Sequence, residues 1–505
     1  MDVQARSGNL VARFADLRRI STPRYRRAHR VGTAASNWWE PTNAAGILLT
    51  SVRNVSVLTV TYWARPPRRY FGRVNRLLTQ EGSSLNIRRT STTTIALLAG
   101  VYVIDYIDRV AISVALPFIG SDLHLDKTQQ GFVVSAFAIA YMLSQLPGGV
   151  LADRFGARPL LVISLLGWSV FTAATGLVHG LVLLLVVRAL FGVAQALFPP
   201  ASFKALAERT TPQTRTRSAG FILASNALGA GAGTLLMAPL IASVGWRHSF
   251  WLIALVGAIV GVLMWRFLPS PLPREFTDDH QPVEEEIVGW KQVLRNSVVW
   301  RYALLFCCFN MLSYGMITWV PSYLLEVRGL SLVAAGVSSA VPLLINAGTA
   351  VLGGWLVGRY FDGRAKWFVV PVLVAASVLL VLMLQTTSAT TFTILQACAM
   401  ACSGLAIMGI LGMPLRALPR EYVGAGMGIV NTGGQFAGVV APLVMGFLAQ
   451  HVSYTAAFGF LAGATLCAAL IAIITPSTIP QWQPGERVES SSKSTEKESD
   501  VNARA

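Results

Sequence analysis

The chain has 505 residues, of which 53% are hydrophobic and only 13% charged, and its mean hydropathy is +0.55. Soluble domains carry about 25% charged residues, so this composition excludes an ordinary soluble protein and predicts an integral membrane protein. The net charge of +17 does not indicate nucleic-acid binding, because residues 1–90 hold sixteen Arg against four acids and supply +12 of it.

The first 93 residues form a basic extension. They are rich in Arg, Ser and Thr and poor in acids, which is the composition of an organellar transit peptide. However, no Met occurs between Met1 and Met142, and the segment has no sustained apolar periodicity. We therefore favour a disordered extension, or a start codon assigned too far upstream, over a targeting sequence.

From residue 94 onward, apolar runs of about 20 residues alternate with short polar breaks, which predicts membrane-spanning helices. Basic residues gather in alternate loops, so the positive-inside rule places both termini in the cytoplasm. The predicted fold class is an all-α membrane protein with twelve transmembrane helices, at residues 94–118, 131–151, 160–178, 181–203, 217–241, 247–268, 301–324, 333–357, 367–386, 391–415, 423–448 and 454–475.

The twelve predicted helices form two repeats of six. Residues of the first half recur in the second at an offset near 205, as in the pairs Gly131 and Gly336, Gly149 and Gly354, Asn226 and Asn431, Gly229 and Gly434, and Gly233 and Gly438. Two similar halves in the same orientation are typical of a transporter whose halves rock about a central site. The predicted domains are the extension at 1–93, the two halves at 94–268 and 301–475, a cytoplasmic linker at 269–300 and a disordered cytoplasmic tail at 476–505.

Three charges interrupt the first predicted span: Asp105, Asp108 and Arg109. Each charge near the centre of a span costs about 2.5–3.5 kcal/mol on insertion scales. Their spacing places them on one helical stripe, which a bundle could shelter from lipid. The fourth span carries Arg188 and Gln195, and a buried Arg is a functional candidate with Asp105 or Asp108 as its expected partner.

The loop between the second and third spans contains a Gly-rich, charged motif. It resembles the signature loop of the major facilitator superfamily, a resemblance that implies a gating role for its residues. A second copy, in the other half, has Gly358 where the first has its acid. The gating residues implied by the first copy are Gly149, Asp153, Arg154, Gly156 and Arg158.

A closer resemblance covers about residues 94–475. The sequences Tyr106-x-Asp108-Arg109, Ser135-Ala136-Phe137 with Tyr141, and Trp319-x-Pro321-x-Tyr323-Leu324 are similar to those of the anion:cation symporter family. Members of that family carry organic anions such as sugar acids, usually with protons. The resemblance implies that Asp108 and Arg188 belong to a coupling network. It also implies that the substrate cavity is lined by Tyr106, Arg109, Tyr141, Asn226, Asn431 and Gln435.

The chain departs from the family at Gln195, where a Glu is usual. An amide does not take up a proton near neutral pH, so coupling by that residue is excluded. Either Asp105 or Asp108 carries the proton, or the protein is an exchanger or facilitator. We slightly prefer Asp105, on the reasoning that Arg109 or Arg188 holds Asp108 ionised.

The sequence thus predicts a monomeric transporter of a bacterial inner membrane that imports a small organic anion with protons. Arg109 is the first candidate for binding the carboxylate and Arg188 the second, since a guanidinium offers a bidentate fork. No catalytic group, metal site or cofactor is predicted, so the protein is not expected to be an enzyme. The alternatives are an organic phosphate or drug exchanger, and a non-transporting membrane sensor. Tyr314 and Trp319 are candidates for substrate contact, although aromatic residues in spans are more often packing or interfacial residues.

Overall fold

A computed structural model describes residues 68–273, 290–361, 363–418 and 422–476. The chain divides into two compact units, Met1–Ser84 and Leu85–Ala505. Residues 68–93 are helical, whereas 1–67 and 477–505 lie outside the described residues. The predictions for the extension and for most of the C-terminal tail therefore stay predictions.

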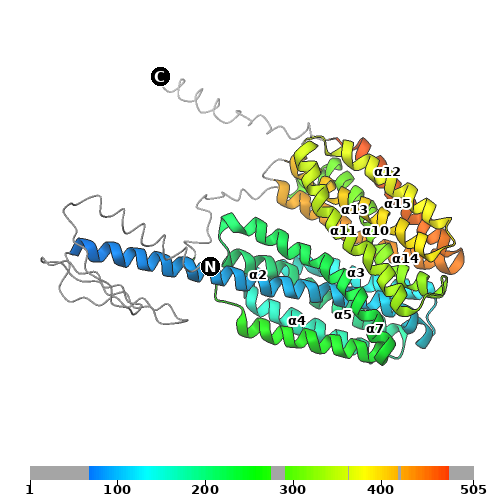
Figure 1. The fold of residues 1–505 in the computed structure, drawn as a ribbon, viewed down its shortest axis with the longest axis horizontal. Helices are drawn as coiled ribbons and strands as arrows, with labels where there is room; N and C mark the ends of the chain where they lie inside the picture. Colours follow the sequence, from blue (N-terminus) through cyan, green and yellow to red (C-terminus); the bar gives the residue numbers. More distant parts are fainter. Residues whose placement is uncertain (1–67, 274–289, 362, 419–421, 477–505) are drawn as a thin grey trace, which may run out of the picture. The chain divides into compact units, whose positions relative to one another are not determined.

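The regular elements of the described residues are α-helices (Figure 1). In chain order they are α2 (Arg68–Asp122), α3 (Lys127–Phe155), α4 (Ala157–Thr175), α5 (Leu181–Ala196), α6 (Phe198–Arg209), α7 (Pro212–Phe267), α9 (Trp290–Arg295), α10 (Ser297–Glu326), α11 (Leu332–Tyr360), α12 (Ala365–Leu384), α13 (Ala389–Ala417), α14 (Val423–His451) and α15 (Tyr454–Ile474).

Ten of the described helical stretches are long and apolar enough to cross a membrane, with α5 and α6 counted as one. Helix α7 is among them and contains two spans divided at Gly245, while α2 is interrupted by its three charges. Counting α2 and both parts of α7 gives the twelve crossings that the sequence predicts. The predicted fold class is confirmed.

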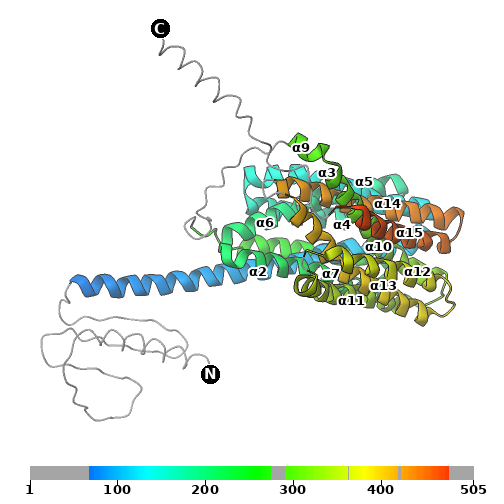
Figure 2. The ribbon, with the colours of Figure 1, turned by 90° about the horizontal axis from the view of Figure 1, so that it is seen from above.

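The helix boundaries follow from local chemistry. Gly156 and Gly245 have φ values of 83° and 78°, a left-handed conformation that favours glycine, so the chain turns sharply at both positions. The Asp126 side chain caps the N-terminus of α3 by accepting from the Gln129 backbone amide. Helix α6 follows α5 directly at Pro199 and packs against α3 and α4 (Figure 2).

The internal repeat reappears as equivalent helix packing. In the first half, Gly229 of α7 lies against Val103 and Tyr106 of α2; in the second, its counterpart Gly434 of α14 lies against Phe306 of α10. A side chain at either glycine would meet these neighbours at 2.9 Å or less. The paired glycines are therefore conserved within the chain because both halves need the same close helix contact.

The two halves contact each other through α3 with α14 and through α7 with α11, and α3 and α14 lie side by side (Figure 1, Figure 2). Another glycine pair of the repeat serves these contacts. Gly131 of α3 lies against the Pro442 carbonyl oxygen, and Gly336 of α11 lies against Ala238. Ser135 Oγ also donates to the Val439 carbonyl oxygen at 2.7 Å. The halves thus meet through backbone atoms and small side chains.

At the end of the bundle where α3 begins, polar contacts add to this packing. Lys127 forms an ion pair with Glu326, and its backbone amide donates to Gln450 Oε1 at 3.0 Å. Tyr454 donates to the other carboxylate oxygen of Glu326 at 2.9 Å. The contacts of Lys127 join the two halves at this end of the bundle.

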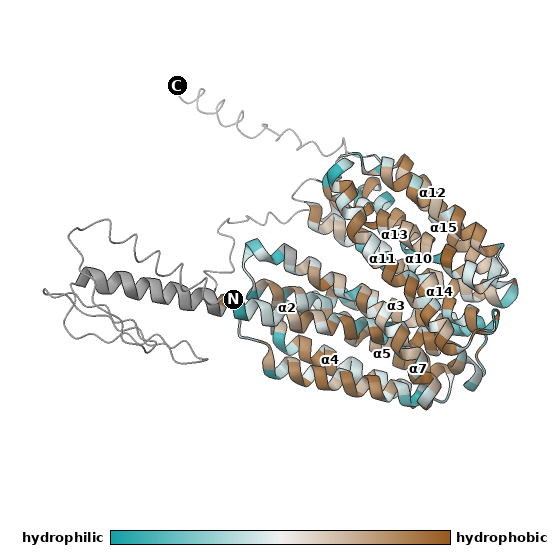
Figure 3. Cartoon of the chain, viewed as in Figure 1, coloured by the Kyte–Doolittle hydropathy of each residue, from teal (hydrophilic) through white to brown (hydrophobic). Residues whose placement is uncertain are grey.

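Hydrophobic residues predominate along the helices of the bundle (Figure 3). Large hydrophobic side chains are exposed along several helices, among them Leu146 of α3, Val170 of α4, Val182 of α5, Leu263 of α7 and Ile474 of α15. A soluble monomer rarely exposes such extensive apolar surface, whereas a bilayer solvates it. The protein is a multi-pass membrane protein.

Replacement of Gly192 by Ala tests the contact that presses α5 onto α3. A Cβ at Gly192 would lie 2.6 Å from the Phe137 carbonyl oxygen, whereas a Cβ at Gly428 would have no neighbour within 4 Å. Overpacking of this kind costs about 1–3 kcal/mol, so Gly192→Ala should lower the Tm of the detergent-purified protein. Gly428→Ala is the control and should leave the Tm equal or higher, since Ala favours helix. Equal Tm values for the two variants would contradict the close contact.

Candidate functional site

The candidate site is built around α2, where the charged stripe predicted from the sequence faces the interior. Asp105 and Asp108 are buried, and Arg109 is partly buried. Gly229 and Gly233 of α7 lie against Val103 and Ile107 of the same helix. The glycines thus let α7 cover the face of α2 that carries Val103 and Ile107. The two acids are buried on another face of the same helix.

Arg109 lies at the centre of the site. Its Nε donates to Gln195 Oε1 at 2.9 Å and lies 3.3 Å from Asp105 Oδ2. Its guanidinium carbon stands 4.3 Å from the centre of the Tyr141 ring and 5.1 Å from that of Tyr106. Both contacts with oxygen use Nε, and no hydrogen bond within the described part of the chain uses Nη1 or Nη2. The bidentate edge of the guanidinium is therefore open to an anion.

Gln195 links α5 to α2 through both ends of its amide. Besides accepting from Arg109, it donates from Nε2 to the Asp105 backbone carbonyl oxygen at 3.4 Å. The side chain is fully buried. Because the amide donates and accepts at once, it fixes the direction of Arg109 Nε without carrying a charge.

Arg188 is buried, and it does not form the ion pair predicted from the sequence. Its guanidinium carbon lies 4.7 Å from the ring centre of Phe191 and 5.3 Å from that of Phe137. Asp108 is close enough to attract it, yet no ion pair within 4.0 Å joins Arg188 to either Asp105 or Asp108, and Arg188 Nε has no hydrogen-bond partner among the described residues. Asp105 is instead paired with Arg109, one helical turn away.

Asp108 has a different environment from Asp105. Its Oδ1 accepts from Thr172 Oγ1 of α4 at 3.3 Å, and the Trp168 indole also lies beside it, outside hydrogen-bond geometry. Its Oδ2 has no hydrogen-bond partner among the described residues. Of the two buried acids, Asp108 is therefore the one without an ion pair.

The second half contributes Tyr314 of α10, whose Oη donates to Gln435 Oε1 of α14 at 2.8 Å. Tyr314 lies within electrostatic range of Arg109, Tyr106 and Tyr141. Of the two roles that the sequence left open for Tyr314, packing and substrate contact, this position favours the second. Its only sequence signal was an aromatic hydroxyl in a span.

The remaining predicted substrate residues are less closely connected. Asn226 of α7 is half-buried, and its Oδ1 has no hydrogen-bond partner within the described residues. Asn431 is exposed on α14, one turn before Gln435. The structure thus brings together Arg109, Tyr106 and Tyr141 with Gln195 and Asp105, but gives no direct contact from either Asn to Arg109. Trp319 packs in the core and donates from Nε1 to the Pro442 carbonyl oxygen.

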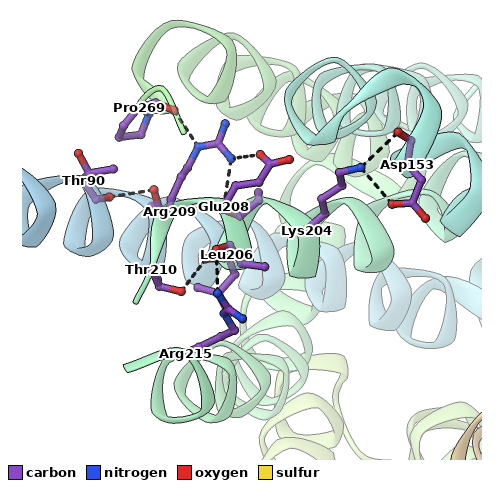
Figure 4. A network of polar contacts seen from close by, with 12 residues as sticks. Thr90, Asp153, Lys204, Leu206, Glu208, Arg209, Thr210, Arg215 and Pro269 are labelled. Atoms are coloured by element: carbon purple, nitrogen blue, oxygen red, sulfur yellow. Dashed lines mark hydrogen bonds and ion pairs between the residues drawn. The ribbon is translucent and has the colours of Figure 1, made fainter. Parts of the chain in front are cut away.

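The predicted gating loop lies at the opposite end of α3 from Lys127. The Asp153 side chain is 82% exposed and pairs with Lys204 of α6 at 3.0 Å, as Figure 4 shows. Both residues belong to the first half, so this ion pair does not join the two halves. Arg158 donates to the Trp265 carbonyl oxygen, and Arg154 lies over the Phe155 ring. No neighbour lies within 4 Å of a Cβ built at Gly149 or Gly156.

A second polar cluster lies beside this loop (Figure 4). Arg209, at the end of α6, donates to the Pro269 carbonyl oxygen at 2.8 Å and pairs with Glu208 at 2.6 Å. Ser91 of α2 donates to the Arg209 carbonyl oxygen at 2.8 Å. These bonds tie α2 and the residues after α7 to the end of α6.

The fold and this site define a membrane transporter with two six-helix halves. A profile of the Major Facilitator Superfamily matches residues 98–418 and 363–500, and the chain belongs to that superfamily. The predicted superfamily is confirmed.

The curated relatives are transporters rather than enzymes. The chain is 28% identical over 393 residues to the hexuronate transporter of Bacillus subtilis, covering 75% of this chain and 92% of the relative. It is 26% identical over 385 residues to the probable L-galactonate transporter of Escherichia coli, covering 72% and 84%. It is 30% identical over 390 residues to the probable sulfoacetate transporter SauU of Cupriavidus necator, covering 72% and 89%.

Solved structures show the same fold. A bacterial homolog of the human lysosomal transporter Spinster, in an inward-facing and unoccupied conformation, matches with a TM-score of 0.63 at 17% identity, over 76% of this chain and 95% of that one. The D-xylose-proton symporter matches with a TM-score of 0.64 at 16% identity, over 77% and 98%.

Asp153→Asn tests whether the exposed loop governs conformational exchange. Its ion pair with Lys204 is largely solvated, so its loss should leave the Tm and ligand binding nearly unchanged. We expect transport to slow several-fold, because this loop must rearrange when the halves move. Transport rate and ligand affinity should be measured on the same preparation, with Lys204→Met as the matched loss of the ion pair. Loss of binding by a stable Asp153→Asn protein would contradict a gating role.

Proposed function

We propose that the protein imports a small organic anion of the sugar-acid type across a bacterial inner membrane, by alternating access and with proton coupling. The open edge of the Arg109 guanidinium is the observation that carries this proposal. The relatives whose names specify hexuronate, L-galactonate and sulfoacetate support an anionic substrate. The proposal includes a monomeric protein with both termini in the cytoplasm.

Recognition of the carboxylate follows from the way in which Arg109 is held. Gln195 and Asp105 both contact Nε, so the two terminal nitrogens remain for a bidentate pair with a carboxylate. The rings of Tyr106 and Tyr141 flank the guanidinium and keep its plane from turning. Tyr314 and Gln435 offer hydroxyl and amide groups that suit the hydroxyls of a sugar acid.

The ion pairing changes our preference for the proton carrier from Asp105 to Asp108. Protonation of Asp105 would break its ion pair with Arg109 and disturb the anion-binding group. Protonation of Asp108 would break no ion pair and would remove an unpaired charge from the membrane interior. We therefore assign coupling to Asp108 and anion binding to Arg109.

Replacing Arg109 with Lys should weaken uptake although the positive charge is kept, because Lys lacks the bidentate fork. Charge-assisted hydrogen bonds are worth about 1.5–3 kcal/mol, so the apparent affinity should fall by roughly tenfold to a hundredfold. The substrate for this assay is the acid that most stabilises the purified protein in a thermal-shift screen of organic acids, and uptake is measured in proteoliposomes. Exposed Arg359→Lys is the control. Unchanged uptake kinetics, or stabilisation by cations alone, would argue against the anion-binding role.

Replacing Asp108 with Asn should separate exchange from accumulation. The Asn side chain accepts from Thr172 as Asp108 does but takes up no proton, so substrate exchange across the membrane should persist. Accumulation driven by an acidic outside should be lost. Asp126→Asn is the control, since Asn also caps a helix well. If the Asp108→Asn protein still accumulates substrate against a gradient when a pH difference is imposed, Asp108 is not the coupling residue.

A further inference from the structure

The bundle interior carries a balanced set of charges. Within the twelve spans predicted from the sequence, the charged side chains that lie away from the span ends are Asp105, Asp108, Arg109 and Arg188. Their sum is zero. A bound monocarboxylate would bring the interior to −1, and an uncompensated charge in a membrane interior is expensive. One proton would restore neutrality.

Asp108 is the place where that proton fits. From its own helix it faces the charge of Asp105; from α4 it faces Thr172 and Trp168, and from α5 it faces Arg188. The tyrosines around Arg109 are Tyr102, Tyr106, Tyr141 and Tyr314. In this set Asp108 is the carboxylate that forms no ion pair within 4.0 Å, and its Oδ2 accepts no hydrogen bond. The proton would pass from the external solution to Asp108 and leave to the cytoplasm with the substrate.

Only one cation in the described interior is presented to a ligand. The Arg109 side chain is 13% exposed and has its terminal nitrogens open. Arg188 is 2% exposed, with Phe137 and Phe191 stacked against its guanidinium. It is therefore unable to receive a second carboxylate without a rearrangement of the aromatic core.

The second half presents neutral polar groups to the site. Tyr314 and Gln435 are bonded to each other near Arg109. The charged residues of α10, α11, α13 and α14 lie near helix ends, and they are Arg301, Glu326, Arg359, Arg416 and, when protonated, His451. The far end of a bound acid would thus meet hydroxyl and amide groups but no cation.

We propose that the site is matched to a monocarboxylate taken up with one proton, so that transport is electroneutral, and that it discriminates against dicarboxylates of the same carbon skeleton. This inference rests on the proposed import of organic acids. The names of the relatives do not determine the charge of the substrate. L-galactonate carries one carboxylate. Galactarate, which is named for a Bacillus subtilis relative that is 27% identical, carries two.

The test uses the full-length protein in proteoliposomes and pairs of acids that differ by one carboxylate: D-galactonate with galactarate, D-gluconate with D-glucarate, and benzoate with phthalate. Substrate flux and internal pH are recorded together while valinomycin and potassium gradients set the membrane potential. We expect one proton per monocarboxylate. We also expect each dicarboxylate to compete at least tenfold more weakly than its partner.

The membrane potential gives the sharpest readout. One net charge per cycle would change accumulation about tenfold for each 59 mV imposed, whereas an electroneutral cycle should show no change. Potential-dependent accumulation of a monocarboxylate, or equal uptake of both members of a pair, would overturn the inference while the proposed function stands. If no acid of any pair is taken up, the proposed function fails and the inference fails with it.

A variant with a second cation tests the same idea by gain of function. Gln435→Lys would place a positive charge on α14 beside Tyr314, opposite Arg109. The preference for the monocarboxylate over its dicarboxylate should then fall at least tenfold relative to the unmodified protein. Gln435→Met, which has similar length but no charge, should affect both acids alike. An unchanged preference in a folded, active Gln435→Lys protein would overturn the charge-matching argument.

Discussion

The constraint on which the rest of the structure depends is the burial of two acids and an Arg in the middle of α2. Each such charge costs about 2.5–3.5 kcal/mol in a span that faces lipid. Three features reduce this cost: the ion pair between Arg109 and Asp105, the amide of Gln195, and the aromatic faces around the guanidinium. The ion pair lies within α2, but Gln195 and Tyr141 come from other helices. The first span is therefore stable only as part of the bundle.

Burial of these charges also requires close helix packing. Partners at hydrogen-bond distance require backbones that nearly touch, and glycines provide this contact where α7 meets α2 and where α5 meets α3. The second half repeats the pattern with Gly434 and Gly438 against α10. That half carries no charged stripe, and there the same geometry positions Tyr314 and Gln435. The repeat thus supplies equal scaffolds, and only one of them holds the charges.

The sequence predicted the twelve spans and the repeat, because apolar run length and a fixed offset determine these features. It indicated the grouping of Tyr106, Arg109 and Tyr141 only through the family resemblance. It did not predict which acid pairs with Arg109. Asp105 and Asp108 share one stripe with it, and the side-chain rotamers that decide between them depend on Gln195 and Thr172 from distant helices. The role of Tyr314 stayed open for a similar reason, since its position results from how the two halves meet.

Gln195 shows how a neutral residue can separate two tasks. A carboxylate at this position would attract Arg109 only while ionised, so the direction of the guanidinium would vary with protonation. The amide keeps its bonds to Arg109 and to the Asp105 carbonyl oxygen whatever the local proton occupancy. Arg109 can then stay oriented for an anion while the adjacent Asp108, bonded to Thr172 of α4, changes its charge. In the proposed mechanism, anion binding and proton coupling thus fall to two adjacent residues of one helix segment, and Gln195, which orients the first of them, does not titrate.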